Sequence, residues 1–100
     1  MIRDADGYPV SSFSTSMRTG DVAAYTLVLD CESGYEFFAD AVTDLAVEAK
    51  RSADASWVDI ETTPIDLTPW AGTQQQFDVR LTASGSGNVR RTFALRVEHS

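Results

Sequence analysis

Histidine and cysteine, which often act as general bases, nucleophiles or metal ligands, occur once each in this 100-residue chain, as His99 and Cys31. A hydrolytic triad would require a serine on a strained turn beside His99 and a third group that orients the imidazole. A tetrahedral metal site needs four ligands, which one histidine and one cysteine cannot supply without heavy use of carboxylates. The sequence therefore predicts a protein that is not an enzyme and that binds no metal and no cofactor.

Cys31 is expected to fill space in the core. It falls on the inward side of an alternating segment, where a cysteine behaves as a small apolar residue. A reactive thiolate needs nearby cations, whereas the adjacent Asp30 and Glu32 should raise the pKa of the thiol. With one cysteine in the sequence, no internal disulfide is expected.

Trp57 is a candidate binding residue. It alternates with Val58 and Ile60, which are expected to face the core, so the indole either points outward or is turned by a bulge. An exposed tryptophan could stack on a sugar or anchor a protein partner. The alternative is that Trp57 covers the edge of one sheet. Trp70, which follows Pro69, is instead expected to plug the core.

The net charge of −7 is unevenly distributed along the chain. Residues 1–49 contain nine acidic and two basic residues, which account for the whole net charge, and residues 50–100 contain six of each. Such an acidic surface repels phosphate backbones, so no nucleic-acid partner is expected. The apolar run around residues 27–29 is far shorter than the roughly 20 residues of a membrane helix, and no secretion signal is visible, so we expect a soluble protein.

Apolar and polar residues alternate along much of the chain, which is typical of half-buried β-strands. Strands are predicted near residues 22–31, 35–42, 43–52, 57–62, 77–83 and 89–97. The alanine-rich segment 37–50 could also form a helix, but Phe38, Val42 and Thr43 favour a strand. Six or seven short strands predict an all-β fold, a two-sheet antiparallel β-sandwich over residues 21–100.

Residues 1–20 differ in composition from the rest. They are rich in Ser, Thr, Gly and Asp and are predicted to form an extended N-terminal arm that ends in an edge strand. Their one alternating set is Phe13, Thr15 and Met17. The arm could lie on its own domain or on a neighbouring molecule, with Tyr8 and Phe13 as its predicted partner-binding residues.

The last two predicted strands are expected to pair as a hairpin around residues 84–88. The register that matches their inward sides sets Ala83 opposite Val89. It would bring Arg80, Arg90 and Arg96 onto one outer sheet face. Such a cationic face could dock on an acidic protein surface or on a copy of the chain. Alternatively, the arginines only keep the surface solvated.

The order of residues in the second half resembles the back half of fibronectin type III and immunoglobulin-like sandwiches. The resemblance covers residues 45–98 and consists of Trp57, then LTPWAGT at 67–73, then FDVRLTA at 77–83 before a glycine-rich turn. The sequence departs from that pattern because Cys31 has no disulfide partner and because Trp70 stands where a corner tyrosine is usual. The length and style of the chain also resemble small capsid decoration proteins of tailed bacteriophages.

These resemblances imply a non-enzymatic structural protein that binds the surface of a larger protein assembly. The expected role is that of a bacteriophage capsid decoration or accessory virion protein, assembled in the host cytoplasm and located on the virion surface. Its expected partner is a capsid or tail protein, with a homo-oligomer as a further expectation. The alternative is a stand-alone recognition module that binds carbohydrate or a host-surface protein through loop tips and Trp57.

Overall fold

The computed structural model describes the backbone of residues 2–4, 12–18, 20–40, 44–84 and 88–99, and the side chains of residues 2, 20–40, 44–84 and 94–99. Within these ranges the chain forms nine strands and a short 3-10 turn. They are β1 (Ile2–Asp4), β2 (Ser12–Arg18), β3 (Val22–Asp30), β4 (Tyr35–Ala39), β5 (Leu45–Arg51), β6 (Val58–Asp59), β7 (Ile65–Asp66), η1 (Thr68–Trp70), β8 (Gln74–Ala83) and β9 (Asn88–His99).

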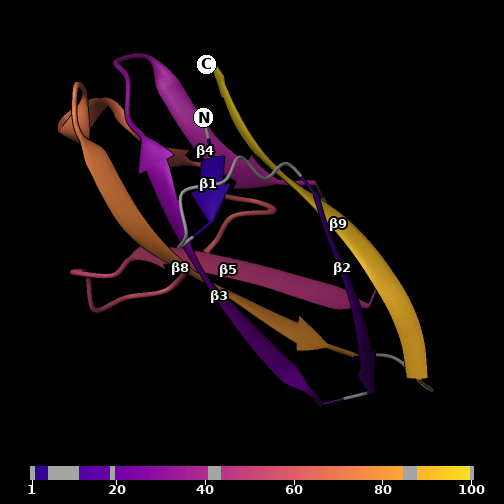
Figure 1. Ribbon diagram of the computed structural model, residues 1–100. Coiled ribbons are helices and arrows are strands. Elements are labelled where there is room, and N and C mark those ends of the chain that lie inside the picture. The colour runs from indigo at the N-terminus through magenta and orange to yellow at the C-terminus, as the bar shows by residue number, and fades with distance from the viewer. Residues whose placement is uncertain (1, 5–11, 19, 41–43, 85–87, 100) are drawn as a thin grey trace.

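The strands form two antiparallel sheets (Figure 1). The order is β1-β3-β8-β5-β6 in the five-stranded sheet and β2-β9-β4-β7 in the four-stranded sheet. Residues from both sheets belong to one hydrophobic core. The prediction of an all-β, two-sheet antiparallel sandwich is therefore confirmed. In the described part of the chain, no helix is long and apolar enough to cross a membrane.

The core forms where the inward positions of the two sheets meet. Phe37 of β4 and Phe77 of β8 are fully buried, and their rings pack edge to face with centroids 5.5 Å apart. The ring of Trp70 packs on Phe77 from the end of the sandwich, at 6.1 Å. Edge-to-face aromatic pairs stabilise by about 0.5–1.5 kcal/mol beyond the burial of their area. These three rings join the two sheets and the 3-10 turn.

Burial follows the two-residue period that the sequence predicted. In β5 and β8, alternate residues are buried from Leu45 to Ala49 and from Phe77 to Ala83. The described part of segment 37–50 is strand and not helix, because Phe37–Ala39 and Leu45–Lys50 lie in β4 and β5. Cys31 is 2% exposed, as expected for a core residue.

The predicted hairpin of the last two strands is wrong. β8 pairs with β3 and β5, whereas β9 pairs with β2 and β4 in the other sheet. Ala83 lies opposite Leu45, and Val89 lies opposite Met17. Neighbours on both sides occupy the hydrogen-bonding edges of β8, so none is left for β9. Figure 1 shows β9 beside β2, in a different layer from β8.

The described parts of the N-terminal segment are edge strands, one in each sheet. β1 pairs with β3, and Ile2 is 7% exposed in the core. β2 pairs with β9 over its whole length. The chain then passes to the five-stranded sheet at Gly20, whose φ of 87° is readily adopted by glycine. The backbone N–H of Gly20 donates to the carbonyl of Ala83 at 2.9 Å, which ties this crossing to the end of β8.

Candidate functional site

The outer face of the five-stranded sheet carries an aromatic residue stacked on cations. The core-facing residues of β5 and β8 are buried, so the intervening side chains point outward. The Arg80 guanidinium carbon lies 4.3 Å from the centroid of the Trp57 ring, and Lys50 Nζ lies 5.3 Å from it. Both cations belong to the outer face, so the indole lies over this side of β5 and β8.

Two ion pairs between β5 and β8 involve the cations that contact the indole. In one pair the base is on β8 and the acid on β5, and in the other pair this arrangement is reversed. Arg80 lies opposite Glu48 in the register, and its Nε and Nη2 donate to Glu48 Oε1 at 3.2 and 3.0 Å. Lys50 lies opposite Asp78, with Nζ 3.4 Å from Oδ2. Opposite charges at directly facing positions stabilise a strand pair. The two pairs leave the cluster neutral overall.

Further hydrogen bonds fix the acidic side chain of the second pair. Ser52 Oγ donates to Asp78 Oδ1 at 2.8 Å, and Gln76 Nε2 donates to Ser52 Oγ at 3.0 Å. Lys50 Nζ also donates to the backbone carbonyl of Asp54 at 2.9 Å. We call this set the Trp57 cluster. It consists of Glu48, Lys50, Ser52, Trp57, Gln76, Asp78 and Arg80.

Small, mostly apolar residues continue the same outer face toward the other end of the strands. Val22 is 60% exposed and lies opposite Thr82. Thr82 in turn lies opposite Ala46 of β5, and Ala24 lies opposite Arg80. Ala24 and Ala46 are exposed. The Trp57 cluster therefore borders a surface of short side chains.

The structure separates the three predicted docking arginines. Arg80 lies in the five-stranded sheet with Trp57, whereas Arg90 and Arg96 are on β9 of the four-stranded sheet. The outer faces of the two sheets lie on opposite sides of the sandwich, so the predicted arginine face does not exist. The prediction failed because it depended on the hairpin register.

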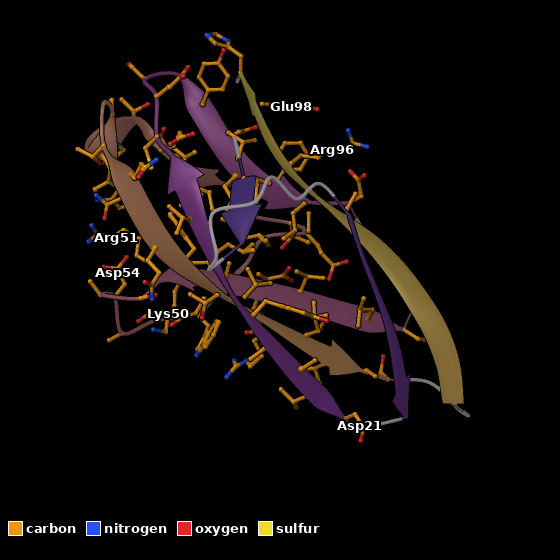
Figure 2. All side chains as sticks on the ribbon, viewed as in Figure 1. Asp21, Lys50, Arg51, Asp54, Arg96 and Glu98 are labelled. Carbon is orange, nitrogen blue, oxygen red and sulfur yellow. The ribbon has the colours of Figure 1, made fainter. Side chains whose placement is uncertain are left out.

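Arg96 has acidic partners of its own. Its Nε donates to Asp40 Oδ2 at 2.8 Å, and its Nη1 donates to Glu98 Oε1 at 3.4 Å. The hydrogen bond to Asp40 raises the pKa of Arg96. Figure 2 shows Arg96 and Glu98 beside β9, well apart from Lys50 and Arg51. The charge of Arg96 is thus balanced by Glu98 on the same strand and by Asp40, which directly follows β4.

The two predicted docking residues of the arm are placed only in part. The backbone register sets Phe13 of β2 opposite Phe93 of β9. Tyr8 lies outside the described residues. Arg90 is likewise placed by register alone, opposite Ser16.

A second cation and tryptophan pair, which was not predicted from the sequence, connects the end of β5 with η1. The Arg51 guanidinium carbon lies 4.4 Å from the centroid of the Trp70 ring. Its Nε and Nη2 donate to the two carboxylate oxygens of Asp54 at 3.1 and 3.0 Å. These hydrogen bonds lower the pKa of Asp54 and raise that of Arg51. The sequence did contain a signal for this contact. Arg51 continues the inward set of its strand, where a long charged side chain is expected to lay its stem on apolar surface.

Cys31 and His99 carry the two side chains whose types most often act in catalysis. Burial, followed by the charge of Asp30, raises the pKa of the Cys31 thiol, which favours its protonated form. His99 is exposed, and its ring packs edge to face against Tyr35 at 5.2 Å. Among the described residues, no three His, Cys, Asp or Glu side chains are grouped so that they could hold a metal ion.

The class of protein defined by this geometry is an all-β sandwich with an ordered aromatic and ionic cluster on one outer face. Comparison with known protein families, with curated proteins and with solved structures returned no match to this chain.

Proposed function

We propose that this chain is a non-enzymatic structural protein that binds the surface of a larger protein assembly through the outer face of its five-stranded sheet. The observation that carries the proposal is the stack of Trp57 on Arg80 beside the exposed surface of short, mostly apolar side chains. Tryptophan and arginine are the residue types enriched at the energetic centres of protein interfaces. Truncating such residues costs more binding energy than truncating their neighbours.

The order in the Trp57 cluster favours binding. Glu48 holds the Arg80 guanidinium, and Asp78 is held by Lys50 and Ser52. Side chains that are already fixed lose less conformational entropy when a partner binds. The neutral balance of the two ion pairs lets this face approach another protein without the repulsion expected from a net charge of −7.

The order in which the strands pair supports an immunoglobulin-like arrangement. An immunoglobulin constant-type sandwich has sheets ABED and CFG. The series β1-β3-β8-β5 corresponds to ABED, and β4-β9-β2 corresponds to CFG. The position of the last strand, G, is then filled by β2, which is the second strand of the chain. We take a bacteriophage capsid or tail as the assembly, in keeping with the resemblance of the chain to capsid decoration proteins, and place its role on the virion surface.

Co-sedimentation with assembled particles of the phage that encodes the chain tests this function. Arg80→Ala should lower the affinity by at least about tenfold, which corresponds to about 1.4 kcal/mol. Arg96→Ala is the matched control, since it removes an arginine that is also paired with acids but lies on the other sheet. Equal binding of Arg80→Ala and the native chain would exclude this face as the docking surface.

The second candidate function is a recognition module for carbohydrate or a host-surface protein. It is favoured by the contact of the Trp57 indole with Lys50 and Arg80, whose neighbours in the Trp57 cluster include side chains that can hydrogen-bond sugar hydroxyls, namely Ser52, Gln76 and Asp78. A glycan array separates the two functions. Saturable binding of a glycan that is lost in Trp57→Ala, with no binding to assembled particles, would favour the second.

A further inference from the structure

The strands at the four sheet edges differ greatly in length. In the part of the chain that the structure describes, three edges are formed by β1, β6 and β7, which have three, two and two residues. Very short edge strands limit the pairing of one molecule with another. The fourth edge is β2, with seven residues, no proline and no lysine. Of these edges, β2 therefore offers the longest template for a further strand.

One side of β2 is already paired. The ladder with β9 runs without interruption from Ser12 opposite Ala94 to Arg18 opposite Asn88. Among the described strands, β2 has no second neighbour. Because backbone groups in an antiparallel ladder alternate between the two sides of a strand, β2 can pair on its other side while it keeps its bonds to β9.

The sequence of β2 suits antiparallel pairing with a copy of itself. In the register centred on Thr15, this residue lies opposite Thr15 of the second copy and all seven residues are paired. Phe13 then lies opposite Met17, and Ser14 lies opposite Ser16. Each alternating set therefore faces itself, which keeps the two sides of the joined sheet consistent.

This register also avoids electrostatic repulsion. Arg18 is the one charged residue of β2, and it lies opposite Ser12 of the other copy. Like charges at directly opposite positions destabilise a strand pair, and this register contains none. The acidic residues that give the chain its net charge of −7 lie outside β2.

We propose that β2 pairs with β2 of a second copy across a two-fold axis at Thr15, which joins two four-stranded sheets into one continuous eight-stranded sheet. The same surface of both copies takes part, as in most two-fold dimers. Strand addition of this kind derives its affinity from main-chain hydrogen bonds. The dimer uses an edge of the four-stranded sheet, so it is independent of the function proposed for the outer face of the five-stranded sheet.

Analytical ultracentrifugation and disulfide cross-linking of the full chain test the dimer. Sedimentation of the native protein from about 10 µM to about 1 mM should show a monomer that converts to a dimer. In Thr15→Cys, the two introduced thiols face each other on strands whose opposite Cα atoms are about 4.5–5.5 Å apart, a distance that a disulfide can bridge. Mild oxidation should therefore link two chains. Native Cys31 is buried and does not compete.

Ser12→Cys is the matched control, because it introduces a thiol on the same strand. Its two introduced thiols would lie six residues apart along the pair, about 20 Å, so cross-linking should be slow. In an equal mixture of Ser14→Cys and Ser16→Cys, these two positions lie opposite each other. The mixture should therefore cross-link faster than either variant alone, and it replaces Thr15→Cys as the test if that variant fails to fold. A native chain that stays monomeric throughout the concentration range would overturn the proposal, as would equal cross-linking of Thr15→Cys and Ser12→Cys.

Discussion

The two tryptophans should contribute unequally to the free energy of unfolding, although both stack on cations. Replacing Trp57 by alanine removes its contacts with Arg80 and Lys50 at the surface. A cation–π contact stabilises by about 0.5–1 kcal/mol at exposed sites, so the loss should be about 1–2 kcal/mol. Replacing Trp70 removes a ring that packs on buried Phe77 as well as on Arg51. Core-packed tryptophans cost about 3–5 kcal/mol when truncated, and Trp70→Ala should approach that range.

Urea unfolding followed by far-ultraviolet circular dichroism measures both losses. The midpoint should fall in both variants with the slope unchanged, so that the shift reports stability alone. Thermal midpoints should differ by at least about 4–8 °C between Trp57→Ala and Trp70→Ala, since about 1 kcal/mol shifts a domain of this size by that amount. A loss for Trp57→Ala that equals or exceeds the loss for Trp70→Ala would refute the assignment of Trp57 to the surface and Trp70 to the core.

Three further variants test the core, the ion pairs and the thiol. Leu81→Ala should lower the free energy of unfolding by about 2–5 kcal/mol, whereas Thr82→Ala on the outer side should change it by less than about 0.5 kcal/mol; similar losses in both would contradict the alternation of β8. The lowered pKa of Asp54 adds stability that is complete above its unfolded pKa of about 3.9 and is lost as the pH falls through the lower folded value. The free energy of unfolding of Asp54→Asn should therefore fall less steeply with decreasing pH than that of the native chain. An equal pH dependence in both proteins would count against the bond between Asp54 and Arg51. Cys31 should react slowly with iodoacetamide at neutral pH until urea exposes it; fast labelling of the folded protein would show that the thiol is accessible.

Much of the fold could be predicted from local pattern. The inward residues of β5 and β8 follow from a two-residue period, because a strand with one face in a core must alternate. The same period correctly favoured strands over a helix in the described part of segment 37–50. The period also put Arg51 on the inward side, although its contact with Trp70 was not anticipated.

The candidate site could be predicted only in part. Trp57 and Arg80 were both singled out, but no local pattern indicated that they would stack on each other. Their contact depends on the pairing of β5 with β8 and on the turn that carries Trp57 back over the sheet. The predicted grouping of Arg80 with Arg96 failed because it assumed that strands adjacent in sequence are neighbours in a sheet.

The sequence by itself determined which side of each strand is buried, since that choice depends on the residues of one strand and on the preference of apolar side chains for the core. Only the tertiary structure decided which strands are neighbours. Several strands in this chain have an apolar side of similar length and could pair with one another without changing which residues are buried. The choice among them depends on the closure of both sheets at once. β8 is enclosed by β3 and β5, and β9 pairs with β2 and β4, both of which lie more than 40 residues away from it along the chain.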